Sequence, residues 1–226
     1  NFAAPRLIVT ISDATPEADI IIGSSQDVPV STFTFRSRRH DHVVEKITLS
    51  NCLIPSQDLD GDCADAGEQP GNDQIVDVLR IFYQDEFGNE EEESGYLVDG
   101  DVVFDNLELY VPAGEERDLV VMIDAHLEGN EGAYSGDWIR LNFNARASED
   151  RFSALDIVNE RTLTQDDMNK YVMAKPMQLR RSQPEFSLFG GTPSGAAMPE
   201  LIEVLIFDIA ADSGGDVSIR ELVFDI

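Results

Sequence analysis

The stretch "DWIRLNFNARA" (residues 137–147) decides the fold class, because apolar and polar residues alternate along it. In an extended chain, successive side chains point to opposite faces. One face would carry the apolar set Ile139, Leu141, Phe143 and Ala145, and the other the polar set Arg140, Asn142 and Asn144. This period of two predicts a half-buried β-strand with one face toward the core and the other toward water.

The same alternation recurs in segments rich in β-branched and aromatic residues: "STFTFRS" (31–37), "EKITLSN" (45–51), "IVDVLRIFYQ" (75–84) and "RDLVVMIDA" (117–125). Turn sequences separate them, such as "DEFGNE" (85–90), "VDGD" (98–101) and "VPAGEE" (111–116). The best helical candidate, 164–173, is short. These features predict an all-β sandwich of Greek-key or immunoglobulin-like type.

Composition narrows the classes of partner. The 226 residues include 44 acidic and 16 basic side chains, which gives a formal net charge of −28. Such a charge repels phosphate backbones and anionic lipid, so nucleic acid is a poor partner and cations or basic proteins are better ones. No run approaches the roughly 18 apolar residues of a membrane helix, so direct membrane insertion is not expected.

The chain has two cysteines, Cys52 and Cys63, on either side of a short Asp- and Gly-rich stretch. A disulfide fits this spacing better than half of a zinc site, because no further Cys or His lies nearby. Two free thiols remain the alternative. A disulfide would imply an oxidising compartment, which is the cell exterior or the periplasm. Of these we expect an extracellular, cell-surface location.

The loop "QDLDGDCADAGEQ" (57–69) is the strongest candidate for a metal site. Its carboxylates are Asp58, Asp60, Asp62, Asp65 and Glu68. The spacing is not that of an EF-hand, but Ca²⁺ takes six to eight oxygen ligands, and alternate carboxylates converge when a loop curls around the ion. The sequence therefore predicts a calcium site pinned by the disulfide, with a solvated acidic loop as the alternative.

Other polar clusters carry weaker signals. His40 and His42 would share a face of an extended strand as a metal pair could, but a polar turn is the simpler interpretation because no third ligand is evident. The run Glu90–Glu93 is typical of a solvated face. No nucleophile elbow, phosphate-binding glycine loop or zinc-protease motif is present in the sequence, so we do not expect an enzyme.

A weak internal repeat indicates a second module. Aligning Asp41 with Asp216 places Ile47 on Leu222, within two similar segments at residues 30–51 and 202–226. We therefore expect a sandwich domain over 1–168 and a partial second β module over 169–226. Three explanations for a partial module stay open: the native chain continues, another chain completes it by donor-strand complementation, or its strands pack onto the first domain.

Both ends of the chain resemble a known kind of repeat. The second segment contains "PSGA" (193–196) and "ADSGGDV" (211–217), and the chain opens with "LIVTISDATPEADIIIGSSQDVPVSTFTF" (7–35). These motifs resemble repeat modules of large secreted cell-surface proteins, of S-layer or filament type, from uncultivated small-genome bacteria. The resemblance implies β-sandwich modules arranged along a surface protein, and it carries over no functional residue.

The sequence therefore predicts a non-catalytic structural subunit of an extracellular filament or surface layer. It would assemble with copies of itself, or with a related surface protein, by β-strand pairing, and calcium would stabilise the acidic loop. The alternative is a surface adhesin or carbohydrate-binding module, which exposed aromatic residues clustered at one end of the sandwich would favour.

Overall fold

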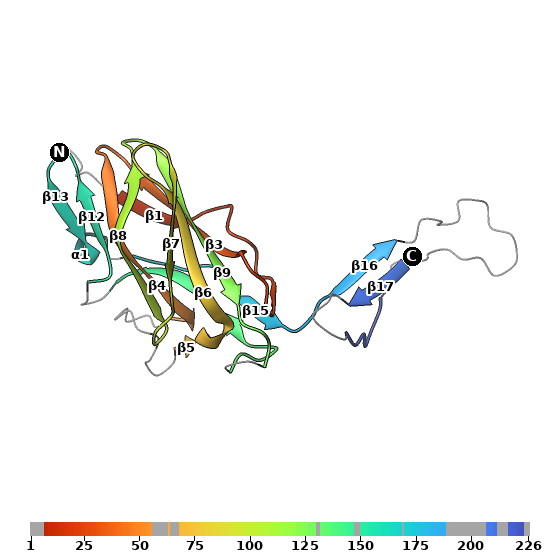
Figure 1. Ribbon diagram of the computed structural model, residues 1–226. Helices are drawn as coiled ribbons and strands as arrows, with labels where there is room; N and C mark the ends of the chain where they lie inside the picture. The colour runs from red at the N-terminus through yellow and green to blue at the C-terminus, as the bar shows by residue number, and fades with distance from the viewer. Residues whose placement is uncertain are drawn as a thin grey trace, which may run out of the picture.

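The computed structural model describes residues 7–55, 63, 68–129, 132–146, 150–168, 170–188, 207–211 and 217–223. Nearly every regular element in these ranges is a β-strand, and most of the strands form two large stacked sheets (Figure 1). The predicted all-β sandwich is confirmed. The two short helical elements are η1 (Asp73–Ile75) and α1 (Gln165–Met168).

The first sheet is antiparallel, and its strands lie in the order β1-β3-β9-β6-β7. The strands are β1 (Leu7–Ile11), β3 (Val28–Ser37), β9 (Glu116–Ala125), β6 (Val76–Gln84) and β7 (Glu90–Gly95). Strand β9 is inserted between β3 and β6, although it follows both of them in sequence. A strand order that departs from the chain order in this way is typical of Greek-key sandwiches.

The second sheet is built around β4 (His42–Ile54), the longest strand. Strand β8 (Asp101–Val111) pairs along one edge of β4, and β5 (Gln69–Pro70) pairs with its end. The remaining strands are β11 (Leu141–Ala145), β12 (Ser153–Asp156), β13 (Arg161–Thr164) and β14 (Lys170–Val172), in the order β13-β12-β4-β11-β14. A small third sheet joins β10 (Trp138–Ile139), β15 (Met177–Arg180) and β2 (Ile20–Ile22).

Aromatic side chains fill the space between the two large sheets. The ring centroid of Phe143 in β11 lies 6.0 Å from that of Phe33 and 5.7 Å from that of Phe35, both in β3. Phe152 packs on the same ring at 6.0 Å. All four side chains are fully buried, so Phe143 joins the two layers as the alternating pattern predicts.

The polar face of the same strand departs from prediction. Asn142 and Asn144 are 0% exposed, so the expectation that they face water is wrong. Their face of the sheet is covered inside the protein, and their amides are hydrogen-bonded there. Arg140 alone of the three predicted polar residues is partly exposed.

The packed sandwich extends to Arg180, past the predicted boundary at residue 168. Strand β14 pairs with β11, and β15 pairs with β10 and β2. Val172, Met177 and Leu179 from this segment belong to the main hydrophobic core.

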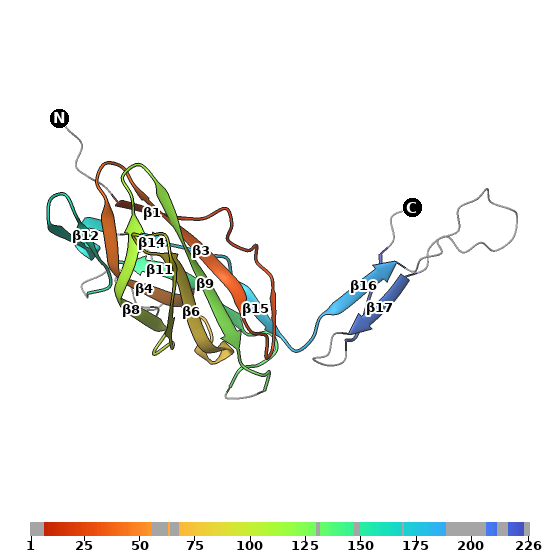
Figure 2. The same cartoon turned by 45° about the horizontal axis from the view of Figure 1, so that its top comes forward.

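A separate hairpin follows the sandwich. Strand β16 (Pro184–Leu188) pairs with β17 (Phe207–Ala211), and within the described residues neither strand pairs with any other. Figures 1 and 2 both show this hairpin beyond the end of the sandwich, following β15.

Candidate functional site

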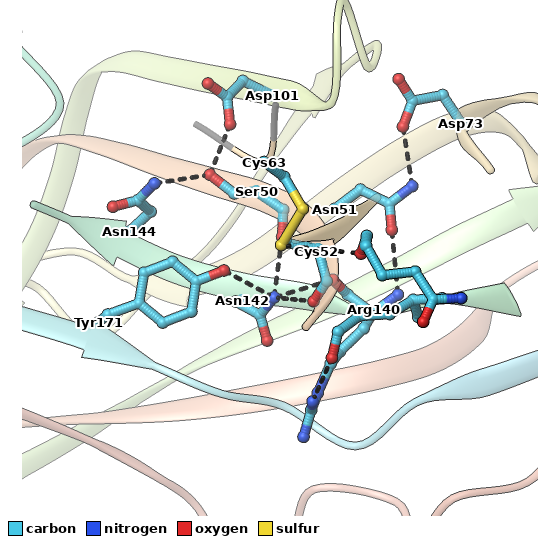
Figure 3. Close-up of a disulfide and its surroundings, with 12 residues drawn as sticks. Ser50, Asn51, Cys52, Cys63, Asp73, Asp101, Arg140, Asn142, Asn144 and Tyr171 are labelled. Carbon is cyan, nitrogen blue, oxygen red and sulfur yellow. Dashed lines mark hydrogen bonds between the residues drawn. A yellow bond between two sulfur atoms is a disulfide. The ribbon is translucent and has the colours of Figure 1, made fainter. Parts of the chain in front are cut away.

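The disulfide lies at the end of the central strand of the second sheet. Cys52 in β4 bonds Cys63, with an S–S distance of 2.06 Å and 5.7 Å between the Cα atoms (Figure 3). The predicted pairing is therefore confirmed, and the alternative of two free thiols is excluded. The bond fastens the acidic loop to β4, whose Cys52 is almost fully buried.

The calcium prediction falls mostly outside the described residues. Asp58, Asp60, Asp62 and Asp65 all lie outside them, and only Glu68, which is half-buried and directly precedes β5, lies within. Among the described residues, no group of three or more His, Cys, Asp and Glu side chains could hold a metal. Calcium at this loop stays a prediction.

Beside the disulfide, Asn142 occupies the centre of a buried polar layer on β4 and β11 (Figure 3). Its Nδ2 lies 2.8 Å from the carbonyl oxygen of Cys52, 3.2 Å from that of Ser50 and 3.0 Å from the hydroxyl of Tyr171. Its Oδ1 accepts the backbone N–H of Ala174 at 3.1 Å. Both ends of the amide are thus satisfied, which offsets the cost of burying it.

The layer continues toward β8 through charged groups. Asn144 Nδ2 donates to Ser50 Oγ at 2.8 Å, and Ser50 Oγ donates in turn to the carboxylate of Asp101. Arg151 Nη1 pairs with the same carboxylate at 2.6 Å. The charge of Asp101 is therefore compensated where the sheet is covered.

Tyr171 closes the other side of the layer. Burial raises the pKa of its phenol to about 12, so the hydroxyl stays protonated at neutral pH. The guanidinium of Arg146 lies 5.3 Å from the centre of the ring, at cation–π distance. Burial also lowers the pKa of the Arg146 guanidinium.

At the end of the layer, Asn51 joins three segments. Its Nδ2 donates to Asp73 Oδ1 at 2.8 Å, and its Oδ1 accepts the backbone N–H of Arg140 at 3.1 Å. Gly71 lies so close that a Cβ there would come within 1.9 Å of the Asn51 Oδ1. Gly71 is therefore required by the close approach of its backbone.

The polar atoms of this layer form hydrogen bonds to other groups inside the protein. Ser50, Asn142 and Asn144 are almost completely buried and bonded to neighbouring groups, so a substrate has no access to them. The chemistry of the layer is that of a structural network which joins β4, β8, β11 and β14. The sequence does not predict this network. An Asn that alternates with apolar residues along a strand gives the same pattern whether its face of the sheet is exposed to solvent or buried.

The two histidines that the sequence analysis weighed as a metal pair, and interpreted as a polar turn, do not converge on one point. His40 Nδ1 lies 3.0 Å from the carboxylate of Asp156, whereas His42 Nδ1 lies 2.9 Å from Ser37 Oγ and from the carbonyl oxygen of His40. Burial alone would raise the pKa of Asp156, but hydrogen bonds from His40 and Asn159 outweigh it and lower the pKa to about 2. The pair has a structural role at the start of β4.

His42 is itself fully buried, so it is not part of an exposed polar turn. Its Nε2 has no hydrogen-bond partner in the part of the chain that the structure describes. Burial lowers the pKa of this imidazole, because a buried imidazolium would lose its hydration.

Two surfaces outside the network differ in chemistry. The predicted acidic run forms most of β7, an edge strand whose side chains from Glu90 to Glu93 are exposed. Charged side chains on an edge strand discourage pairing with other chains. The hairpin β16–β17 is the opposite case, because Phe186 and Leu188 are 59% and 72% exposed.

No protein-family model and no curated protein matches this chain. Among the described residues, no helix has the length and apolar character needed to cross a membrane. A functional proposal therefore depends on the geometry and on the sequence.

Proposed function

We propose that this chain is a non-catalytic structural subunit of an extracellular filament or surface layer, which assembles by pairing β-strands with another polypeptide. The observation that carries the proposal is the exposure of two large apolar side chains on β16, Phe186 at 59% and Leu188 at 72%. A two-stranded hairpin is marginal alone in water, and stability requires further strands or a covering layer. A subunit that presents such a hairpin outside its sandwich has a surface suited to assembly.

Other features support the same proposal. The disulfide between Cys52 and Cys63 favours an oxidising compartment. The charged edge strand β7 disfavours pairing at the side of the sandwich, so assembly is directed to the hairpin. In addition, residues 168–226 resemble the repeat modules of bacterial cell-surface proteins. Partners would be copies of this chain or a related surface protein.

Calcium belongs to the proposal as a stabiliser of the loop. Carboxylates at Asp58, Asp60, Asp62, Asp65 and Glu68 are the hard oxygen ligands that Ca²⁺ takes. Bound calcium would neutralise part of the net charge of −28, which opposes the packing of like subunits.

Negative-stain imaging of the purified chain tests assembly, in calcium and again after a chelator. We expect regular filaments or sheets in calcium, and their dispersal on chelation. The variant Phe186→Asp should abolish them, whereas Phe87→Asp, at a 79% exposed position on the β6–β7 turn, should not. Single particles under every condition would overturn self-assembly, and filaments indifferent to the chelator would overturn only the calcium role.

A second candidate function is adhesion to carbohydrate. Tyr134 and Trp138 are 60% and 40% exposed near one turn, in which the Asp137 N–H donates to the Tyr134 carbonyl at 2.9 Å. Exposed aromatic rings at a loop end can stack on sugars. A glycan array tests this function: binding that Trp138→Ala removes would favour adhesion, and an array with no binding would exclude the glycans it carries.

A further inference from the structure

An open groove of about 580 Å³ crosses the outer face of the first sheet. Ligand-binding clefts commonly have volumes of about 300–1,000 Å³, so the groove is large enough for a small molecule or for several side chains of a peptide. Residues of all five strands line it, from β1 through β3, β9 and β6 to β7. The side chains that give it its chemistry are Asp13, Phe82, Glu90, Glu116, Asp118 and Val120.

The floor of the groove is apolar. Val120 in β9 and Phe82 in β6 are directly opposed, so they share one face of the sheet. Their neighbours Leu119 and Ile81 point to the other face, toward the core, where both are fully buried. Val120 and Phe82 therefore lie on the outer face, and both stay half-buried there. An apolar floor of this kind favours a ligand that has an apolar part.

Three exposed carboxylates surround the floor, those of Asp13, Glu90 and Asp118. Glu90 lies on the outer face, because β7 pairs it with Gln84, which alternates with the inward residues of β6. The carboxylate of Asp118 accepts a hydrogen bond of 2.6 Å from Thr34 Oγ1, which fixes its position on the same face. The groove thus combines an apolar floor with negatively charged walls.

Little positive charge opposes these walls. Among the described residues that line the groove, Arg117 is the only basic one, and its guanidinium lies 2.8 Å from the carboxylate of Glu115. Glu116 is paired with Arg36 at 3.6 Å. The three carboxylates of the walls form no ion pair with any other described residue. A cleft with walls of one charge sign concentrates the electrostatic field and attracts ligands of the opposite sign.

Lysine and arginine side chains have both of the properties that the groove requires. Each has a stem of methylene groups that covers an apolar surface while its charged head stays at the polar edge. The head would reach the carboxylates, and it could also lie over the face of the Phe82 ring. An uncharged sugar would leave the carboxylates without a cation. A second copy of this chain is a poor occupant, because the net charge of each copy is −28.

We propose that this groove binds an extended lysine- or arginine-rich segment of another protein. The stem of a basic side chain lies across Val120 and Phe82, and its head pairs with Asp118 or Glu90. The inference goes beyond the proposed function, because it concerns a different part of the molecule from the hairpin β16–β17 and requires no self-assembly.

The probe is a labelled ten-residue peptide in which lysine and serine alternate, and fluorescence anisotropy measures its binding to the full chain. We expect Glu90→Gln with Asp118→Asn to weaken the binding by about tenfold, since two charged contacts are lost. The asparagine side chain keeps an acceptor for the Thr34 hydroxyl, so the variant leaves that hydrogen bond of the sheet in place.

The matched control removes the same charge outside the groove. Glu91 and Glu93 are exposed, and they lie opposite Tyr83 and Ile81, which point into the core. We expect Glu91→Gln with Glu93→Gln to change the affinity by less than about twofold. Equal weakening by the two double variants would overturn the proposal, because the total negative charge alone would then explain the binding.

A second peptide tests the apolar floor. Replacing each lysine of the probe with diaminobutyrate keeps the charge and shortens the stem, so we expect this peptide to bind about threefold more weakly or worse. Equal affinities of the two peptides would refute the role of Val120 and Phe82.

Two further outcomes would overturn the proposal by identifying another occupant. One is binding of uncharged glycans, and the other is self-association of the chain, in either case abolished by Glu90→Gln with Asp118→Asn and without binding of the lysine peptide. Filament formation is a separate result. Peptide binding without filaments would support the groove and refute only self-assembly, and filaments without peptide binding would do the reverse.

Discussion

Asn142 and Cys52 are joined by a hydrogen bond of 2.8 Å, from the side-chain amide of one to the main-chain carbonyl of the other. The strand residue that anchors the disulfide is therefore held from the neighbouring strand by a fully buried side chain. Cys52 therefore takes part in both the disulfide to Cys63 and the hydrogen bond from Asn142.

Replacing this amide should destabilise the sandwich. We expect Asn142→Ala to lower the free energy of unfolding by about 2–3 kcal/mol, because it leaves buried carbonyl groups without a donor. Urea denaturation measures the change. Gln84→Ala, on the exposed side of β6, is the control and should change stability by about 0.5 kcal/mol or less. An equally small effect at Asn142 would show that the network contributes nothing.

The disulfide should contribute a similar amount. Its loop spans a sequence separation of 11. Loops of this size restrict the unfolded chain by about 2–3 kcal/mol, so the double variant Cys52→Ser with Cys63→Ser should unfold at correspondingly lower urea. Reductant should reproduce the loss in the natural chain and have no effect on the double variant. A natural chain insensitive to reductant, with its thiols shown to be reduced, would contradict the prediction.

Phe143 should be the most sensitive position in the core. Its ring contacts Phe33, Phe35 and Phe152, so Phe143→Ala leaves a cavity between the sheets and should cost about 3–5 kcal/mol. The matched control is Phe87→Ala, which removes the same ring from a 79% exposed position. Thermal and urea unfolding should separate the two variants clearly, and equal losses would refute the assigned core.

The sequence predicted this core better than it predicted the polar layer. A period of two identifies Phe143 as apolar and inward whatever covers the other face. Whether Asn142 meets water depends on Tyr171 and on the main chain of Ser50 and Cys52, which lie far from it in sequence. The disulfide itself was predictable because the chain offers only two cysteines.

The extent of the sandwich depends on similar long-range pairing. The segment after residue 168 has the strand and turn pattern of a new module, which predicts a domain boundary there. The parallel pairing of β15 with β2 brings Leu179 into the first core, and nothing local in "MQLR" (177–180) specifies that partner. Strand length and alternation are local properties, whereas the choice of neighbour is a property of the whole fold.

His42 should make stability depend on pH in a defined window. Burial holds the pKa of its imidazole below the ordinary value of 6.5 in the folded state. As the pH falls below about 6.5, the unfolded chain takes up a proton that the folded chain resists, so stability is lost until the folded pKa is reached. Asp156 does not contribute there, because its pKa falls from 3.8 to about 2 on folding and its effect lies at lower pH.

Urea denaturation between pH 8 and pH 5.5 measures this dependence. His42→Gln should flatten the curve, because the variant has no imidazole to protonate at this buried position. His126→Gln, which removes a different imidazole and leaves His42 in place, is the matched control. A slope that survives His42→Gln unchanged would refute the buried imidazole of His42 as its cause.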